Sequence, residues 1–205
     1  MTKQLELWRG SFGQDYIGRN EATPRILRSL GRMWAQMLGD REPASILEVG
    51  ANIGLNLRAL NTLTGAELWA VEPNATARAR LLADSVLPAY HLRDGSAAAL
   101  PFADRQFELA FTSGVLIHVH PDDLAASCRE ITRVSSRYVL CAEYFSTEAR
   151  EVPYRGHSGA LFTRDFGKFY LEHCPELRTV DYGVFWTGAG APDDLMWWLF
   201  ERGPR

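Results

Sequence analysis

Two acids and an open glycine turn follow successive apolar runs in the first half of the chain. Residues 46–60, ILEVGANIGLNLRAL, are typical of a buried strand that enters a glycine turn and continues as a helix. A second apolar run ends at Glu72, roughly 20 residues after the turn, where a carboxylate could accept hydrogen bonds from both hydroxyls of a ribose. A third run ends at Asp94, whose carboxylate could accept from the amino group of an adenine. The pattern favours a nucleoside-like ligand.

The spacing in the glycine turn distinguishes between classes of nucleotide ligand. Dinucleotide-binding enzymes use the pattern GxGxxG, which lets a pyrophosphate meet the start of a helix. Here Asn52 stands at the middle position between Gly50 and Gly54, so the spacing is GxxxG. Leu55 and Asn56 cannot supply the Lys-Ser/Thr ending of a phosphate-binding P-loop. We therefore expect an adenosine ligand without a pyrophosphate, and a nicotinamide-dependent oxidoreductase stays as a less favoured alternative.

A fourth apolar run ends at Ser113 and Gly114, which would bring open backbone to the centre of such a site. His118 follows about one helical turn later. Its imidazole could face the ligand, or it could be an ordinary packed histidine. Both readings fit the sequence.

The segment HVHPDD resembles the histidine–aspartate clusters of metal-dependent hydrolases, but the terminal histidine is missing. Asp122 and Asp123 have a simpler role as acids in the first turn of a helix. His91, His157 and His173 do not have the spacing of metal ligands. We therefore expect no metal site.

Composition excludes several classes of protein. The 205 residues carry a net charge of -3, which gives no electrostatic basis for binding nucleic acid. No apolar run approaches the roughly 18 residues that a membrane span needs, and the N-terminus lacks the apolar core of a signal peptide. Three widely spaced cysteines are typical of reduced thiols, so a cytoplasmic protein is expected. No feature indicates an oligomeric state.

The elements that would position these residues alternate along the chain. Residues 8–20 are glycine-punctuated and are expected to form a loop or short turns, after which Thr23 and Pro24 begin a helix. The periodicity predicts further helices over 52–63, 75–87, 122–134 and 166–173. It predicts strands over 45–50, 67–72, 89–94, 107–113, 137–145, 178–186 and 195–202.

Five strands alternating with helices predict an α/β protein with a mostly parallel sheet of seven strands, covered by helices on both faces. The last two strands are expected to form a C-terminal antiparallel hairpin. We expect one domain over 1–205, with an N-terminal lid and helix at 1–40 and an insertion on the acceptor side at 146–170. Ligands of such sheets bind at the carboxyl ends of the strands, where the residues above fall.

At these residues a family resemblance emerges. The segments LEVGANIG, VEPN and RDGSAAALPFADRQFELAFTSGVLIHV resemble the motif series of class I S-adenosylmethionine-dependent methyltransferases, over residues 46–145. The flanking segments WRGSFGQDYIGRN, VLIHVHPDDL and YRGHSGALFTRDFGKFY resemble the pseudaminic acid biosynthesis-associated methylases. The resemblance implies a Rossmann-like methyltransferase fold. It also implies a cytoplasmic, metal-independent enzyme that methylates a small polar molecule in a surface-glycan or natural-product biosynthesis.

The resemblance assigns S-adenosylmethionine as cofactor. Arg19 is the candidate cation for the methionine carboxylate, although it could equally be a solvated arginine. The expected cofactor-binding residues are Tyr16, Arg19, Glu48, Gly50, Asn52, Gly54, Glu72, Pro73, Asp94, Gly95, Ser96, Ser113 and Gly114.

The stretch after the fifth strand is expected to form the wall of the acceptor site. Its basic residues Arg155, His157 and Arg164 suggest an anionic acceptor such as a sugar acid or a nucleotide-linked sugar. A solvated loop with an Arg–Asp pair would also explain these residues. His118 is the candidate catalytic base, and both oxygen and nitrogen acceptors fit the sequence. A non-catalytic adenosyl-binding subunit is a further alternative. The expected substrate-binding residues are Glu143, Tyr144, Tyr154, Arg155, His157 and Arg164.

Overall fold

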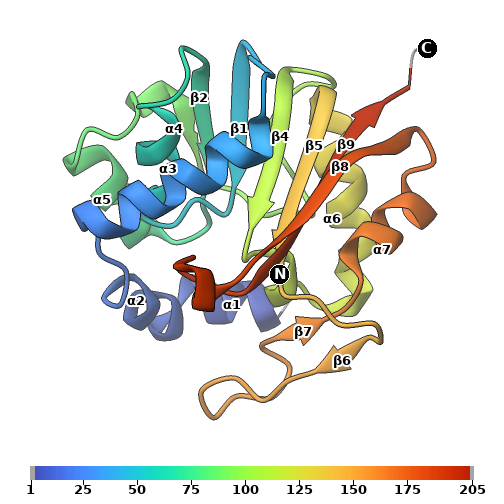
Figure 1. Ribbon diagram of the computed structural model, residues 1–205. Coiled ribbons are helices and arrows are strands. Elements are labelled where there is room, and N and C mark those ends of the chain that lie inside the picture. Colours follow the sequence, from blue (N-terminus) through green and yellow to red (C-terminus); the bar gives the residue numbers. More distant parts are fainter. Residues whose placement is uncertain (1–2, 204–205) are drawn as a thin grey trace.

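The computed structural model describes residues 3–203 and contains a central sheet of seven strands in the order β3-β2-β1-β4-β5-β9-β8 (Figure 1). The first five strands in this order pair in parallel, whereas β9 is antiparallel to both β5 and β8. The strands are β1 (Ser45–Val49), β2 (Glu67–Val71), β3 (Leu92–Arg93), β4 (Phe107–Ser113), β5 (Ser135–Glu143), β8 (Leu177–Phe185) and β9 (Leu195–Arg202).

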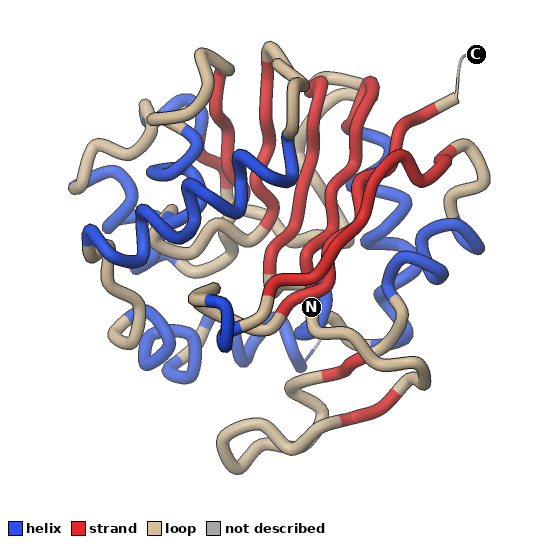
Figure 2. The backbone as a smooth tube through the Cα atoms, viewed as in Figure 1, coloured by secondary structure: helices blue, strands red, loops and turns tan. Residues whose placement is uncertain are grey.

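Helices cover both faces of this sheet (Figure 2). Helices α3, α4 and α5 pack on one face, and α6 and α7 pack on the other. These helices are α3 (Pro24–Leu38), α4 (Leu55–Leu60), α5 (Ala75–Ala83), α6 (Pro121–Val134) and α7 (Phe166–His173). Three short 3-10 helices, η1 (Ala89–His91), η2 (Leu116–His118) and η3 (Thr187–Ala189), complete the connections.

The alternation of side chains along the strands explains the two cores. Ile46 belongs to the apolar cluster under α3 and α4, while its neighbour Leu47 belongs to the cluster under α6 and α7. Trp34 of α3 is fully buried, and its ring lies 4.5 Å from the ring of Phe111. The predicted α/β fold, with its mostly parallel sheet and antiparallel C-terminal strands, is therefore confirmed.

The structure also corrects several predicted elements. The expected loop at 8–20 falls largely within two helices, α1 (Lys3–Arg9) and α2 (Ser11–Ile17). Gly10 and Gly18 lie at the ends of α2, and Gly13 lies where α2 packs against the backbone of Trp8. These glycines are therefore compatible with helices, although their number suggested a loop. The third strand shrinks to β3 because Pro88 starts a 3-10 turn before it. Within 146–170, β6 (Arg150–Glu151) and β7 (Phe162–Thr163) form a small hairpin that was not predicted.

The N-terminal helices lie across the carboxyl ends of the parallel strands. In Figure 1, α1 and α2 lie below the arrowhead of β4, and the β6–β7 hairpin lies beside them. Residues 1 and 2 of the expected N-terminal lid fall outside the described residues. The fold thus places two separate segments at the edge of the sheet where ligands of parallel sheets bind.

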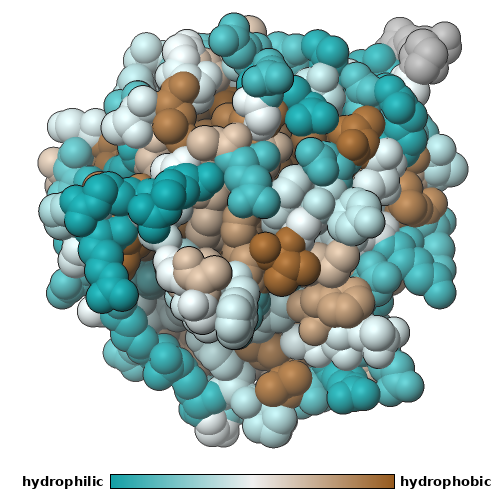
Figure 3. Space-filling view, in the orientation of Figure 1, coloured by the Kyte–Doolittle hydropathy of each residue, from teal (hydrophilic) through white to brown (hydrophobic). Residues whose placement is uncertain are grey.

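No helix within residues 3–203 is long and apolar enough to cross a membrane. On the face drawn in Figure 3, hydrophilic side chains break up the hydrophobic surface.

Candidate functional site

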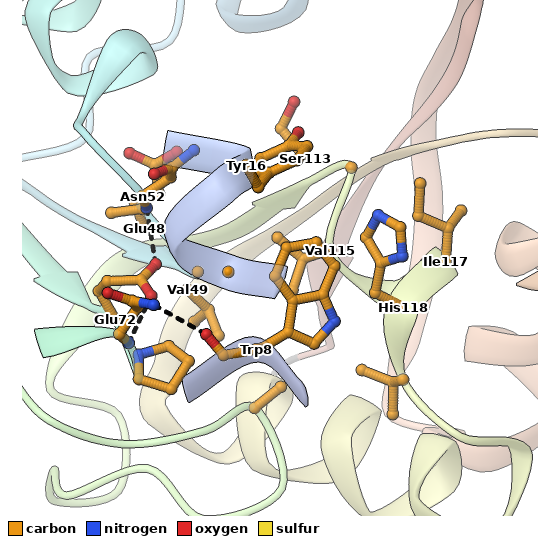
Figure 4. A pocket seen from close by; sticks show the side chains of 18 of the residues that line it. Trp8, Tyr16, Glu48, Val49, Asn52, Glu72, Ser113, Val115, Ile117 and His118 are labelled. Atoms are coloured by element: carbon orange, nitrogen blue, oxygen red, sulfur yellow. Dashed lines mark hydrogen bonds between the residues drawn. The ribbon is translucent and has the colours of Figure 1, made fainter. Parts of the chain in front are cut away.

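A cavity of about 630 Å³ opens at the carboxyl ends of β1, β2 and β4, under α1 and α2 (Figure 4). Its size lies within the range of about 300–1,000 Å³ that is usual for small-molecule sites. Its walls come from the turns after these strands, from the N-terminal helices, from η2 and from the segment before β9. The cavity therefore gathers residues from both ends of the chain.

Glu48 of β1 provides a buried and incompletely satisfied carboxylate. The Asn56 amide donates to Oε1 at 2.7 Å, whereas Oε2 has no hydrogen-bond partner among residues 3–203. Only 2% of the residue is exposed, and burial raises the pKa of this carboxyl to about 8. At pH 7 the ligand-free carboxyl is therefore largely protonated, and a ligand that donates a cationic N–H to Oε2 would favour its ionised form.

Glu72, at the end of β2, joins two turns. Its Oε2 accepts from the backbone N–H of Asn52 and its Oε1 from that of Asn74, each at 2.7 Å. Burial raises the pKa of Glu72, and these backbone N–H groups oppose that effect. Each carboxylate oxygen keeps a second lone pair, and the residue lines the cavity, so it can still accept from ligand hydroxyls.

The two glycines of the turn have different roles. Gly50 has φ 80°, and a Cβ there would lie 2.7 Å from Cγ2 of Val115, so only glycine allows the two loops to approach this closely. Gly54 has φ 75° and lies outside the cavity lining. A Cβ there would lie 2.4 Å from Leu81, so this glycine lets α4 pack against α5.

The turn after β3 reaches the cavity through backbone rather than through its acid. Gly95 and Ser96 line the cavity, but Asp94 does not. Asp94 Oδ1 instead accepts from Arg9 at 2.7 Å and from Arg78 at 3.2 Å. In this structure Asp94 therefore ties α1 to α5 rather than facing a ligand.

His118, in η2, lines the cavity beside Trp8, and the two ring centroids lie 4.6 Å apart. Its Nδ1 lies 2.7 Å from the carbonyl oxygen of Ala160. A carbonyl can only accept, so Nδ1 carries the proton and Nε2 keeps a free lone pair. Burial lowers the pKa of His118 to about 4, and the ring is therefore neutral at pH 7.

Glu143, expected to bind the acceptor, is fully buried and does not line the cavity. Its carboxylate accepts from the backbone N–H groups of Val115, Leu116 and Ile117 at 3.0–3.3 Å. Burial raises its pKa to about 7. Glu143 therefore fixes the backbone that carries His118.

The outer part of the cavity is lined by three tyrosines and an acid. Tyr16 was expected to bind the cofactor, and Tyr144 and Tyr154 were expected to bind the substrate; all three line the cavity. Asp193 also lines it, and the Tyr144 hydroxyl donates to Asp193 Oδ2. The sequence showed Asp193 only as part of a turn-rich link between two strands, which gave no sign of a site.

The structure brings most of the expected cofactor-binding set together. The cavity is lined by Tyr16, Glu48, Gly50, Asn52, Glu72, Pro73, Gly95, Ser96, Ser113 and Gly114. Asn74, Asn56 and Trp8 also line it but were not singled out from the sequence. Asn74 caps α5, and its amide also donates to the Trp8 carbonyl at 2.9 Å.

The expected cations lie elsewhere. Arg19 is exposed, with its guanidinium 5.9 Å from the Tyr16 ring centroid. Arg155 and His157 are exposed at a loop tip, and Arg164 lies over the Phe169 ring at 4.7 Å. None of these four side chains lines the cavity.

The charged lining is acidic. Four carboxylates line the cavity, and no lysine or arginine within residues 3–203 does so. The four are Glu48, Glu72, Asp123 and Asp193. Across the same part of the chain, no group of three or more histidine, cysteine, aspartate or glutamate residues is arranged to hold a metal ion. The cavity is therefore suited to a ligand with positive charge.

Comparison with known proteins identifies the fold. Residues 47–139 match the family model described as a methyltransferase domain. A search of curated proteins finds no match. The 1,6-didemethyltoxoflavin-N1-methyltransferase of Burkholderia thailandensis, solved with 1,6-didemethyltoxoflavin and S-adenosylhomocysteine, superposes with a TM-score of 0.72 at 18% identity, over 97% of this chain and 88% of that one.

Two further solved structures are similar over nearly their whole length. Magnesium protoporphyrin IX methyltransferase from Synechocystis PCC 6803, solved with bound SAH, has a TM-score of 0.69 at 11% identity, over 97% of each chain. A methyltransferase in complex with the Haloferax volcanii Trm112 activator has a TM-score of 0.69 at 14% identity, over 94% of this chain and 96% of that one. The fold is thus the Rossmann-like methyltransferase fold.

The N-terminal helices close this cavity through contacts that a single methyl group would disturb. A Cβ on Gly13 would lie 1.9 Å from the Trp8 carbonyl oxygen and 2.8 Å from the Asn74 amide nitrogen. Gly13→Ala should therefore loosen α1 and α2, at an overpacking cost of about 1–3 kcal/mol. Hydrogen exchange followed by mass spectrometry should show faster exchange over residues 3–17. Gly18→Ala is the matched control, since its Cβ would meet only the Asp15 carbonyl at 3.6 Å. Equal exchange in the two variants would contradict this packing.

The raised pKa of Glu48 predicts a pH-dependent stability. The carboxyl titrates near 4.5 when unfolded and near 8 when folded, so its contribution is complete below pH 4.5 and is lost as the pH rises towards 8. Glu48→Gln resembles the protonated acid at every pH. The melting temperature of the ligand-free variant, relative to that of the parent, should therefore increase steadily from pH 5 to pH 8. Glu42→Gln, at an exposed site, should give a difference that does not change with pH. A constant difference for Glu48→Gln would show that its carboxyl is ionised throughout.

Proposed function

We propose that this protein is an S-adenosylmethionine-dependent methyltransferase that methylates an oxygen or nitrogen of a small polar metabolite in a biosynthetic pathway. The observation that carries the proposal is the pairing of two buried acids, Glu48 and Glu72, in one cavity at the strand ends of a methyltransferase fold. The two similar structures that were solved with S-adenosylhomocysteine are consistent with this cofactor.

The residues present fit this cofactor. The unpartnered Oε2 of Glu48 would accept from the ammonium of its methionine part. The free lone pairs of Glu72 would accept from the ribose hydroxyls, and the open backbone at Gly95 and Ser96 would face the adenine. Gly50 also lines the cavity, so the ligand would lie against backbone there. These acids also complement a ligand that carries positive charge on its sulfur and its amine.

When bound, S-adenosylmethionine supplies a methyl group on a positively charged sulfur, ready for in-line displacement. The chain's own part is to position the acceptor and exclude water. Trp8 and the two N-terminal helices cover the cavity, and Trp8 lies between the two acids and His118 in Figure 4. The free Nε2 lone pair of His118 can accept the proton that the acceptor loses.

The finer identity of the acceptor is also a proposal. The resemblance of the flanking segments to pseudaminic acid biosynthesis-associated methylases favours a sugar or natural-product intermediate. An anionic acceptor was expected from Arg155, His157 and Arg164, but these side chains lie outside the cavity and no longer support that expectation. A nicotinamide cofactor is not favoured, because Asn52 occupies the place of the middle glycine and an acidic lining disfavours a pyrophosphate.

Cofactor binding is the first test. S-Adenosylhomocysteine should raise the melting temperature, with about 2.7 kcal/mol of added stability at a concentration of one hundred times Kd. Glu72→Ala should weaken binding by about 1.5–3 kcal/mol, because a charged hydrogen-bonding group is lost. Calorimetry measures both, and circular dichroism checks that the variant is folded. The control Glu42→Ala, at an exposed position outside the lining, should bind like the parent. A response to NAD with none to S-adenosylhomocysteine would overturn the proposal.

The role of His118 is tested by turnover. If its Nε2 accepts the proton, His118→Ala should lower kcat by a factor of about 10²–10⁴ while Kd for S-adenosylhomocysteine stays unchanged. His173→Ala serves as the control, since this histidine stacks on Phe169 in α7 and does not line the cavity. Full activity in His118→Ala would remove the proton-accepting role and favour a neutral amine acceptor, which needs less help to lose its proton.

A further inference from the structure

Four residues of the cavity lining are grouped under the name tyrosine–aspartate mouth. They are Tyr16, Tyr144, Tyr154 and Asp193. Its members come from α2, from the end of β5, from the 146–170 segment and from the link before β9. The three tyrosines are half-buried, whereas Asp193 is exposed. The mouth is thus built from four segments that the fold brings together at the entrance to the cavity.

Asp193 is held in place by two hydrogen bonds. Its Oδ2 accepts from the Tyr144 hydroxyl, and its Oδ1 accepts from the backbone N–H of Asp194 at 2.9 Å. Neither donor is a cation, and each oxygen keeps a second lone pair. Burial and the nearby Tyr154 and Asp193 raise the pKa of Tyr16, so this phenol stays neutral. The mouth therefore presents one negative charge among neutral aromatic rings.

No lysine or arginine within residues 3–203 lines the cavity. The guanidinium of Arg19 lies 6.0 Å from the Phe12 ring centroid and 5.9 Å from that of Tyr16, and that of Arg155 lies 5.7 Å from the Tyr154 ring centroid. Both arginines are exposed and lie outside the lining. An anionic group entering the mouth would face Asp193 directly. A carboxylate with tyrosines beside it can instead bind an ammonium or guanidinium group.

We propose that the methyl acceptor carries a protonated amine or guanidinium group, which Asp193 and the surrounding tyrosines bind at the mouth. This inference rests on the proposed function. The bound cation is not the atom that is methylated, because a protonated amine has no lone pair for the methyl carbon. The reacting oxygen or nitrogen lies further in, towards His118. There the new bond to carbon forms as the sulfur–carbon bond breaks, sulfur keeps the electron pair, and the proton leaves to His118 Nε2.

The test uses three probes of the same shape and different charge: benzylamine, benzyl alcohol and benzoate. Each is titrated into the protein saturated with S-adenosylhomocysteine and followed by NMR of the protein amides. The parent should bind benzylamine about tenfold more tightly than benzyl alcohol, equivalent to about 1.4 kcal/mol, and should bind benzoate most weakly. Asp193→Asn should lose the preference for the amine while keeping its Kd for S-adenosylhomocysteine.

Asp194→Asn is the matched control, because it removes the adjacent negative charge from a residue that does not line the cavity and whose Oδ1 accepts from Thr187 N–H. It should keep the parent's order of probes. Benzoate binding as well as benzylamine, no probe binding at all, or an unchanged preference in Asp193→Asn would each overturn the inference. A parent protein that does not bind S-adenosylhomocysteine would instead overturn the proposed function, so the two failures are distinguishable.

Discussion

One buried carboxylate determines the shape of the site. Glu143, at the end of β5, accepts from three successive backbone N–H groups that follow β4. These bonds hold Val115 against Gly50 and orient η2, and η2 presents His118 to the cavity and to the Ala160 carbonyl. A buried acid that satisfies three amides is worth far more than a surface contact, because its removal would leave several buried donors without partners.

The same physics recurs at Glu72, which accepts from Asn52 and Asn74 and thereby couples the first two turns at the edge of the sheet. Glu48 differs, because one of its oxygens is buried without a donor. Two acids thus stabilise the loops, and a third keeps free binding capacity. Unsatisfied capacity in an otherwise satisfied site is what distinguishes a ligand contact from scaffolding.

The cover over the cavity is built by local contacts to these turns. Arg9 pairs with Asp94, the Asn74 amide donates to the Trp8 carbonyl, and the Gln4 amide donates to the Gly159 carbonyl at 3.2 Å. The first two are contacts to turns after β2 and β3, and the third reaches the 146–170 segment. Apolar packing adds to these contacts, because Ile17 of α2 is buried in a cluster with Ile53 and Ala77.

The sequence by itself determined the α/β fold, the edge of the sheet where ligands bind, and most of the strand-end residues that line the cavity, because apolar periodicity and strand order depend on local pattern. Only the tertiary structure decided which polar side chains face inward. Glu143 turned towards backbone amides and Asp94 towards Arg9 and Arg78, and Arg155 and Arg164 lie outside the cavity lining. Asp193 entered the site because β9 pairs between β5 and β8, which brings a distant turn to the strand ends. Such choices depend on contacts between residues far apart in the chain, and spacing along a sequence carries no record of them.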